Sequence, residues 1–144
     1  MSIRRVLRPL AVFEAMMQGR YKYGEHAIGD YVVSGTEAAE DVLGVLLLAR
    51  WADITDRGND EVPLDVVPLI ESARALEGAG GILDELLGDP LYRRHLAARG
   101  DRQTVLIGYS DSDKEIGIAA SRQAIYEAQT AVLKVAAGRA VELS

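Results

Sequence analysis

The chain has 144 residues, no cysteine and a formal net charge of −6, from 16 Lys and Arg against 22 Asp and Glu. This length suits one domain, and the lack of cysteine excludes a disulfide scaffold, a thiolate metal site and a thiol nucleophile. An apolar share of 49% with 26% charged residues argues against intrinsic disorder, and the acidic balance argues against a general nucleic-acid binder.

No stretch of about 18 uninterrupted apolar residues occurs, so the sequence predicts no membrane span. The basic residues 1–9 resemble the start of a signal peptide, but Pro9, Glu14 and Arg20 interrupt the apolar core that export requires. We therefore expect a cytoplasmic protein without an export signal.

The first elements alternate between helical and extended patterns. Apolar residues at spacings of three and four predict a helix over residues 3–19, and the β-favouring residues 27–34 predict a strand. The last residue of that strand, Ser34, forms an S-x-x-E capping box with Glu37. This pattern predicts a helix from about residue 35 to Trp51.

The middle of the chain contains a second apolar segment, residues 64–70. We expect a strand there with Pro68 near its end, because proline has no N–H for the ladder of strand hydrogen bonds. A short helix is expected over residues 72–81, with a flexible break at the glycines of residues 78–81, before helical spacing resumes at residues 82–87.

The last part begins with Asp89 and Pro90, which fit the N-cap and first position of a helix that Gly100 ends. Residues 103–109 predict a third strand, and residues 110–113 offer caps for the following helix. The expected buried stripe of that helix consists of Ala120, Ala124, Ala128, Ala131, Val132, Val135 and Ala136. Gly138 closes the helix, and residues 140–144 resemble a fourth strand.

The order is a leading helix followed by alternating strands and helices. Expected strand starts near residues 28, 65 and 103 have nearly equal spacing, which is typical of parallel strands joined by right-handed crossovers. A closed eight-fold barrel needs about 250 residues, so the alternatives are an open doubly wound sheet or part of a larger barrel. A final strand at the chain end favours an α/β fold that is a partial (β/α)8 TIM-type barrel, with about three and a half βα units in one domain, residues 1–144.

Two expected strands end in carboxylates, Glu71 and Asp111. Functional groups collect at the carboxyl ends of parallel strands, and neighbouring strands lie about 4.8 Å apart, so both side chains could hold one Mg²⁺ ion. The alternative is that each carboxylate caps a helix. Lys114 is either a solvated lysine of a first helical turn or a positive charge beside an anionic substrate.

Other candidates have simpler interpretations. Residues 78–81 resemble a glycine-rich phosphate cradle but follow a helix, so a flexible break is favoured. His26 and His95 are expected at the surface or satisfied in the core. The local basic cluster is expected to be a solvated helix end, with an anion contact as the alternative; it consists of Arg93, Arg94, Arg99 and Arg102.

Residues 108–117 read G-Y-S-D-S-D-K-E-I-G and resemble the G-Y-S-D-S-x-K-[DE]-x-G signature of phosphoenolpyruvate carboxylase. Other segments resemble that family in order and spacing: residues 31–34 with 41–43 (Y-V-V-S and D-V-L), 67–71 (V-P-L-I-E), 91–93 (L-Y-R) and 100–103 (G-D-R-Q). The resemblance covers about residues 21–144.

The resemblance implies a lyase that joins bicarbonate to phosphoenolpyruvate, giving oxaloacetate and phosphate. It implies an α/β barrel, a homotetramer of the full-length protein, and Mg²⁺ or Mn²⁺ held by Glu71 and Asp111. Lys114 is the motif lysine that helps to hold bicarbonate or a carboxyphosphate-like intermediate. Nucleic acid and membrane are not expected partners.

The family's H-G-R-G-G loop and T-A-H-P-T segment do not occur in the sequence, so we expect a segment with weak cation binding and no measurable carboxylation alone. Gly35 stands where methionine is usual and Ile70 where phenylalanine is usual; both are expected to be packing changes. Two alternatives are a non-catalytic docking or oligomerisation module and another barrel lyase that handles phosphoenolpyruvate or pyruvate.

Overall fold

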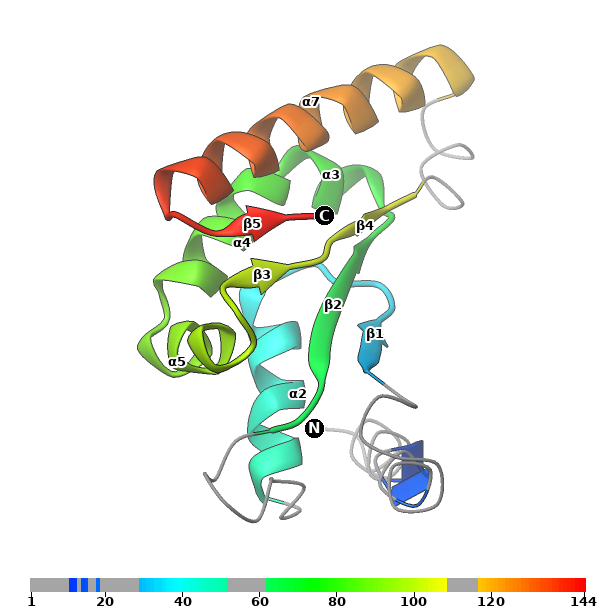
Figure 1. The fold of residues 1–144 in the computed structure, drawn as a ribbon. Helices are drawn as coiled ribbons and strands as arrows, with labels where there is room; N and C mark the ends of the chain where they lie inside the picture. Colours follow the sequence, from blue (N-terminus) through cyan, green and yellow to red (C-terminus); the bar gives the residue numbers. More distant parts are fainter. Residues whose placement is uncertain (1–10, 13, 16–17, 19–28, 52–61, 109–116) are drawn as a thin grey trace.

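The computed structural model describes residues 11–12, 14–15, 18, 29–51, 62–108 and 117–144, and it has an α/β fold (Figure 1). The described residues between 11 and 18 are helical, in the region of the first expected helix. The elements are β1 (Asp30–Val33), α2 (Ala39–Trp51), β2 (Asp65–Ile70), α3 (Ala73–Glu77), α4 (Ala79–Gly88), α5 (Pro90–Ala98), β3 (Arg102–Gln103), β4 (Leu106–Ile107), α7 (Ile118–Gly138) and β5 (Glu142–Leu143).

Every strand pair in the described part of the chain is parallel, as the regular spacing of the strands predicts. Strands β1, β2 and β4 form one sheet in that order, with Tyr31 beside Val66 and Ile70 beside Ile107. Strands β3 and β5 form a separate pair. Strands β1 and β2 are consecutive in the chain and adjacent in the sheet, whereas β2 pairs with β4 and β3 with β5.

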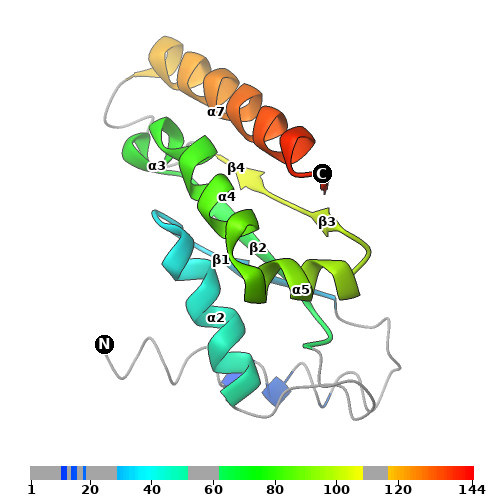
Figure 2. The same cartoon turned by 90° about the vertical axis from the view of Figure 1, so that its left-hand side faces the viewer.

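The described helices α2, α4, α5 and α7 lie on one side of the strands (Figure 2). The core fills the layer between them and includes the buried side chains of Leu46, Ile70, Leu83, Leu86 and Val132. Burying an aliphatic side chain of this size stabilises the fold by about 1.5–3 kcal/mol, so this single layer holds the strands in place. The burial of Ile70 agrees with its expected packing role.

The opposite face of the sheet is more open at its two edge strands. In β1, Tyr31 and Val33 pack against the core, whereas Val32 between them is 41% exposed. In β4, Ile107 packs against the core and Leu106 is 42% exposed. Alternate residues of a strand point to opposite faces, so the helix-covered face packs against the core in all three strands. The opposite face is exposed at β1 and β4, whereas Val67 of the central strand β2, beside Val32, is buried there.

The expected single strand over residues 103–109 is instead two short strands with different partners. Strand β3 pairs with β5, and β4 pairs with β2. The backbone between them continues toward β5, because the N–H of Val105 donates to the carbonyl of Ser144 at 3.0 Å. The prediction of one continuous strand was therefore wrong, since pairing with two distant segments divides it.

Pro68 lies inside β2 rather than at its end. The carbonyl of Leu69 accepts the N–H of Thr36 on the β1 side at 3.1 Å, so the neighbouring Pro68 directs its backbone to the other edge. On that edge the ladder with β4 begins only at Leu69. The missing N–H of Pro68 therefore interrupts no strand pairing.

The predicted flexible break at residues 78–81 is wrong in its extent. Only Gly78 separates α3 from α4, and Gly80 and Gly81 are helical. A Cβ atom at Gly80 would lie 3.1 Å from the Cβ of Ala131 on α7, whereas one at Gly81 would meet nothing within 4 Å. The glycine at position 80 therefore permits α4 and α7 to approach closely.

Several helix ends lie where the sequence predicts them. The side chain of Asp89 accepts the N–H groups of Leu91 and Tyr92, Pro90 begins α5, and Gly100 follows it with a φ of +85°, all as predicted. Helix α7 ends at Gly138, also as predicted.

The predicted capping box at Ser34 is wrong, because α2 begins at Ala39. The side chain of Asp41 instead accepts the N–H groups of Glu37 and Ala38, at 3.0 and 3.1 Å. An acidic side chain inside the first turn thus replaces the expected cap. Residues 34–38 connect β1 to α2 and are not part of the helix.

Helix α7 begins at Ile118 with Gly117 as its N-cap residue, and the expected caps, residues 110–113, lie outside the described residues. Its buried positions include Ala128, Val132 and Ala136 as predicted, but Ala120 is exposed. Ser121 is buried in its place, and its hydroxyl donates to the carbonyl of Gly117 at 2.7 Å. Among the described helices, none combines the length and apolar character needed to cross a membrane.

Candidate functional site

Glu71 directly follows β2 and lies at the carboxyl end of the sheet, as predicted. The backbone N–H of Gly35 donates a hydrogen bond of 2.9 Å to its Oε1 atom. Gly35 has a φ of +63°, in the left-handed region that glycine adopts without steric cost. A Cβ there would meet only Glu71 Oε1, at 3.9 Å, so this glycine serves backbone conformation rather than the packing change expected from the sequence.

Glu71 is not the cap of the helix that follows it. The N-cap of α3 is Ser72, whose hydroxyl oxygen accepts the N–H of Ala75 at 3.1 Å. The capping interpretation, left open by the sequence, is therefore wrong for Glu71. Its carboxylate instead contacts the β1–α2 connection.

Further hydrogen bonds join that connection to the end of β2. The N–H of Thr36 donates to the carbonyl of Leu69 at 3.1 Å, and the hydroxyl of Ser72 donates to Glu37 Oε1 at 3.4 Å. Thr36 is fully buried, and its own hydroxyl donates to the carbonyl of Val33 at 2.7 Å. These bonds hold the β1–α2 connection, which contacts the Glu71 carboxylate, against the end of β2.

Strand β4 ends beside the same place, because the N–H of Gly108 donates to the carbonyl of Ile70 at 3.1 Å. The next residues, 109–116, lie outside the described part of the chain, and they include Asp111 and Lys114. A shared site of Glu71 with these two residues therefore stays a prediction.

The carboxylate of Glu71 is the predicted metal ligand that the structure describes at this edge. Among them, no group of three or more His, Asp or Glu side chains could hold a metal ion. The carboxylate of Glu71 is a hard oxygen ligand of the kind that Mg²⁺ accepts, and Mg²⁺ commonly uses only one or two protein carboxylates. The carboxylate of Glu71 therefore fits a divalent cation, and a second ligand from Asp111 stays a prediction.

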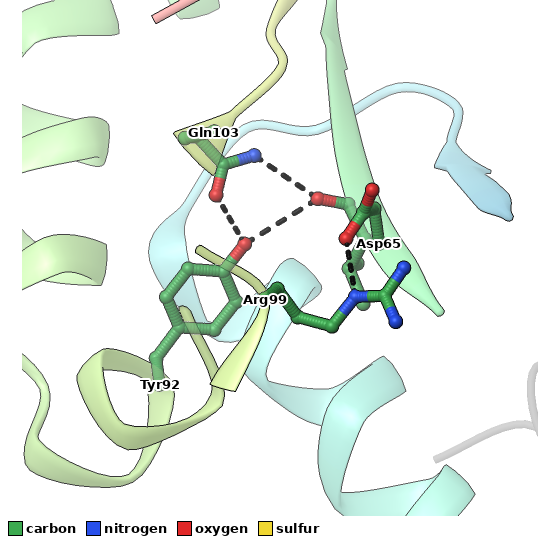
Figure 3. A network of polar contacts seen from close by, with 5 residues as sticks. Asp65, Tyr92, Arg99 and Gln103 are labelled. Carbon is green, nitrogen blue, oxygen red and sulfur yellow. Dashed lines mark hydrogen bonds and ion pairs between the residues drawn. The ribbon is translucent and has the colours of Figure 1, made fainter. Parts of the chain in front are cut away.

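A second polar cluster lies beside the first residues of β2 (Figure 3). The hydroxyl of Tyr92 contacts Gln103 Oε1 at 2.5 Å and the carbonyl of Val66 at 3.3 Å. Gln103 Nε2 donates to the carbonyls of Val66 and Thr104, at 3.0 and 2.7 Å. Burial raises the pKa of Tyr92 above its usual value, so the phenol remains protonated as a donor.

This buried cluster was not predicted as a unit from the sequence. Tyr92 and Gln103 occur in two of the segments that carry the family resemblance, but their contact depends on α5 returning to the strand. Side-chain hydrogen bonds here satisfy a strand carbonyl that no neighbouring strand pairs with, so the cluster has a structural role.

His95 is a buried core histidine, one of the two alternatives expected from the sequence. Burial lowers its pKa to about 4, and the nearby Arg99 acts in the same direction. The imidazole is therefore neutral near pH 7 and packs at 5.8 Å from the ring of Tyr92. His26 lies outside the described residues.

The basic cluster does not form a shared anion site. Arg93 pairs with Asp101, Arg99 with Asp65 at 2.8 Å, and Arg102 with Glu142 at 3.5 Å. Each of these three guanidinium groups thus has its own carboxylate, which favours the solvated helix end over an anion contact. Residues 78–81 do not form a phosphate cradle either, because two of their three glycines lie within α4.

A family model described as phosphoenolpyruvate carboxylase matches residues 3–144. A phosphoenolpyruvate carboxylase of Xanthomonas oryzae pv. oryzae is 48% identical over 134 residues, which cover 93% of this chain and 15% of that protein. The corresponding protein of Azoarcus is 35% identical over 134 residues, with the same coverage. That of Mycolicibacterium paratuberculosis is 37% identical over 131 residues, covering 90% of this chain and 14% of that protein. The chain thus spans about 15% of the length of the curated relatives it matches.

Proposed function

The chain belongs to the phosphoenolpyruvate carboxylase family, and from this premise we propose that it carries the cation-binding strands of such an enzyme. The proposed reaction joins bicarbonate to phosphoenolpyruvate and gives oxaloacetate and phosphate. The observation that carries the proposal is the position of Glu71, whose carboxylate lies at the carboxyl edge of a parallel sheet beside the end of β4. Family membership favours neither the docking module nor another barrel lyase.

The proposed roles follow from the chemistry of the side chains. Glu71 and Asp111 hold Mg²⁺ or Mn²⁺, and Lys114 places a positive charge next to bicarbonate or a carboxyphosphate-like intermediate. When bound, the cation supplies Lewis-acid stabilisation of the oxygen that becomes negative in the pyruvate enolate. Because its Oε1 atom accepts the Gly35 N–H, the carboxylate of Glu71 has a defined orientation before any ligand arrives.

The proposed architecture is one partial-barrel domain over residues 1–144. Two observations support it: every described strand pair is parallel, and the described helices lie on one side of the strands (Figures 1 and 2). A doubly wound sheet reverses its strand order at a switch point and carries helices on both faces. The rest of the barrel, the missing catalytic loops, the homotetramer and a cytoplasmic location are proposed for the longer protein.

The proposal is tested by binding of Mn²⁺ to the 144-residue chain, measured by electron paramagnetic resonance. We expect weak binding that falls at least about tenfold in Glu71→Gln and in Asp111→Asn, because each variant loses a charged ligand. Glu85→Gln is the matched control, since Glu85 is exposed on α4. Binding that is absent from the unmodified chain, or equal in all four proteins, would contradict the proposed site.

A further inference from the structure

We infer that Gly35 is a positioning residue for the cation site, because its main-chain N–H fixes the orientation of the Glu71 carboxylate. This inference rests on the proposed function, and it concerns a residue that itself offers no side chain to a ligand. The two residues are 36 positions apart and meet through a hydrogen bond of 2.9 Å. The donor is a backbone group, so its direction is determined by the conformation of the turn.

The conformation of this turn is unusual and specific. Gly35 has a φ of +63°, and its N–H donates to the Glu71 carboxylate just after β2. Residues with a Cβ atom adopt this region rarely, with asparagine among those that tolerate it best. There is room for a Cβ at this position, since the nearest atom would be 3.9 Å away. Backbone conformation, rather than steric contact, therefore distinguishes one residue from another here.

The turn is held rigidly on its other side. The fully buried Thr36 donates its N–H to the carbonyl of Leu69, two residues before Glu71, and its hydroxyl to the carbonyl of Val33. The donor and acceptor of the Gly35–Glu71 bond are thus attached to the same pair of adjacent strands. Groups that orient a metal ligand commonly change metal affinity by about 10–100-fold when they are removed.

The test measures Mn²⁺ affinity of the full 144-residue chain by electron paramagnetic resonance. The Gly35→Ala substitution disfavours the left-handed turn, whereas Gly35→Asn tolerates it. The control is Gly44→Ala, at a helical glycine where a Cβ atom would meet nothing within 4 Å. We expect the dissociation constant to rise about 10–100-fold in Gly35→Ala and to change little in the other two. An unchanged constant in Gly35→Ala would overturn the inference.

A second measurement requires no substitution at the turn and remains valid if Gly35→Ala folds poorly. In a nuclear magnetic resonance titration with diamagnetic Mg²⁺, the amide signal of Gly35 is expected to shift, since its acceptor carboxylate binds the ion. The shift is expected to disappear in Glu71→Gln and to persist in Glu85→Gln. If the chain binds Mg²⁺ but the amide signal of Gly35 does not shift, the inference is overturned.

These outcomes separate the two proposals. If the unmodified chain binds neither ion, the proposed cation site fails, and the positioning role fails with it. If the unmodified chain binds Mn²⁺ through Glu71 but Gly35→Ala binds it equally well, only the positioning role fails. Circular dichroism of every variant establishes that the compared proteins are folded.

Discussion

The side-chain amide of Gln103 donates a hydrogen bond of 3.0 Å to the main-chain carbonyl of Val66, at an edge of β2 where no described strand pairs. The same Nε2 atom donates to the carbonyl of Thr104, so Oε1 faces the hydroxyl of Tyr92. A buried side chain therefore performs the role of a neighbouring strand. This contact joins β2 to α5 and to the β3–β5 pair.

Replacing Gln103 is expected to destabilise the fold. Gln103→Leu removes one of the two donors to the buried carbonyl of Val66, the donor to the part-buried carbonyl of Thr104, and an acceptor of the Tyr92 hydroxyl. Unsatisfied buried groups cost about 1–3 kcal/mol each, so we expect the free energy of unfolding to fall by about 2 kcal/mol or more in urea denaturation. Gln123→Leu, at an exposed position of α7, is the control. Equal stability of both variants would contradict the structural role.

Stability is expected to fall in mild acid because of His95. Its pKa is about 4 in the folded chain and near 6.5 when unfolded, since burial disfavours the charged imidazole. Between these values the unfolded chain binds the extra proton and the folded chain does not. The contribution of His95 is therefore complete above about pH 6.5 and is lost as the pH falls toward about 4.

The expected loss in the free energy of unfolding is a few kcal/mol over that pH range. Urea denaturation at about pH 7.5 and at about pH 5 measures it. His95→Gln cannot titrate and is the control that subtracts the effect of the carboxylates. We expect the unmodified chain to lose more stability than His95→Gln between the two pH values. Parallel losses in both proteins would show that His95 does not carry this dependence.

Two adjacent glycines of α4 are expected to respond oppositely to substitution. Gly81→Ala is expected to raise the free energy of unfolding by about 0.5–1 kcal/mol, because alanine favours a helix and nothing lies near the new Cβ. Gly80→Ala is expected to lack this gain, and Gly80→Val to lose about 1–3 kcal/mol against Ala131. Thermal unfolding compares the three variants. A stabilised Gly80→Val would contradict the close approach of α4 and α7.

The 144-residue chain alone is expected to produce no measurable oxaloacetate from phosphoenolpyruvate and bicarbonate with Mg²⁺. The physical reason is that Glu71, Asp111 and Lys114 would supply only part of the groups that stabilise the developing charges. An NADH-linked assay measures the product, with a full-length relative as the positive control. A turnover of about 1–10³ s⁻¹ would overturn the expectation of an incomplete site.

Local patterns predicted those features that depend on nearby residues. The Asp89–Pro90 start of α5 and the stops at Gly100 and Gly138 follow from residues close in the chain. The parallel direction of the strands follows from their regular spacing along the chain. Pairing across the sheet could not be read in this way. The division of residues 103–109 into two strands depends on β2 and β5, which are distant in sequence.

The candidate site shows the same limit. The position of Glu71 at the end of a strand was predictable, because strand ends are visible as changes in apolar pattern. Its hydrogen bond to Gly35 was not predictable, because it requires a left-handed turn 36 residues earlier and parallel pairing of β1 with β2. From the sequence alone, Gly35 was noticed only because it departs from the family pattern.

The burial of Thr36 has a consequence for how this region opens. Its hydrogen bonds attach the β1–α2 connection both to β1 and to the end of β2, so neither segment can detach while the other remains in place. Local unfolding proceeds in cooperative units of this kind. The amide hydrogens of Thr36 and of Gly108, which both donate to the end of β2, should therefore exchange with solvent deuterium at similar rates.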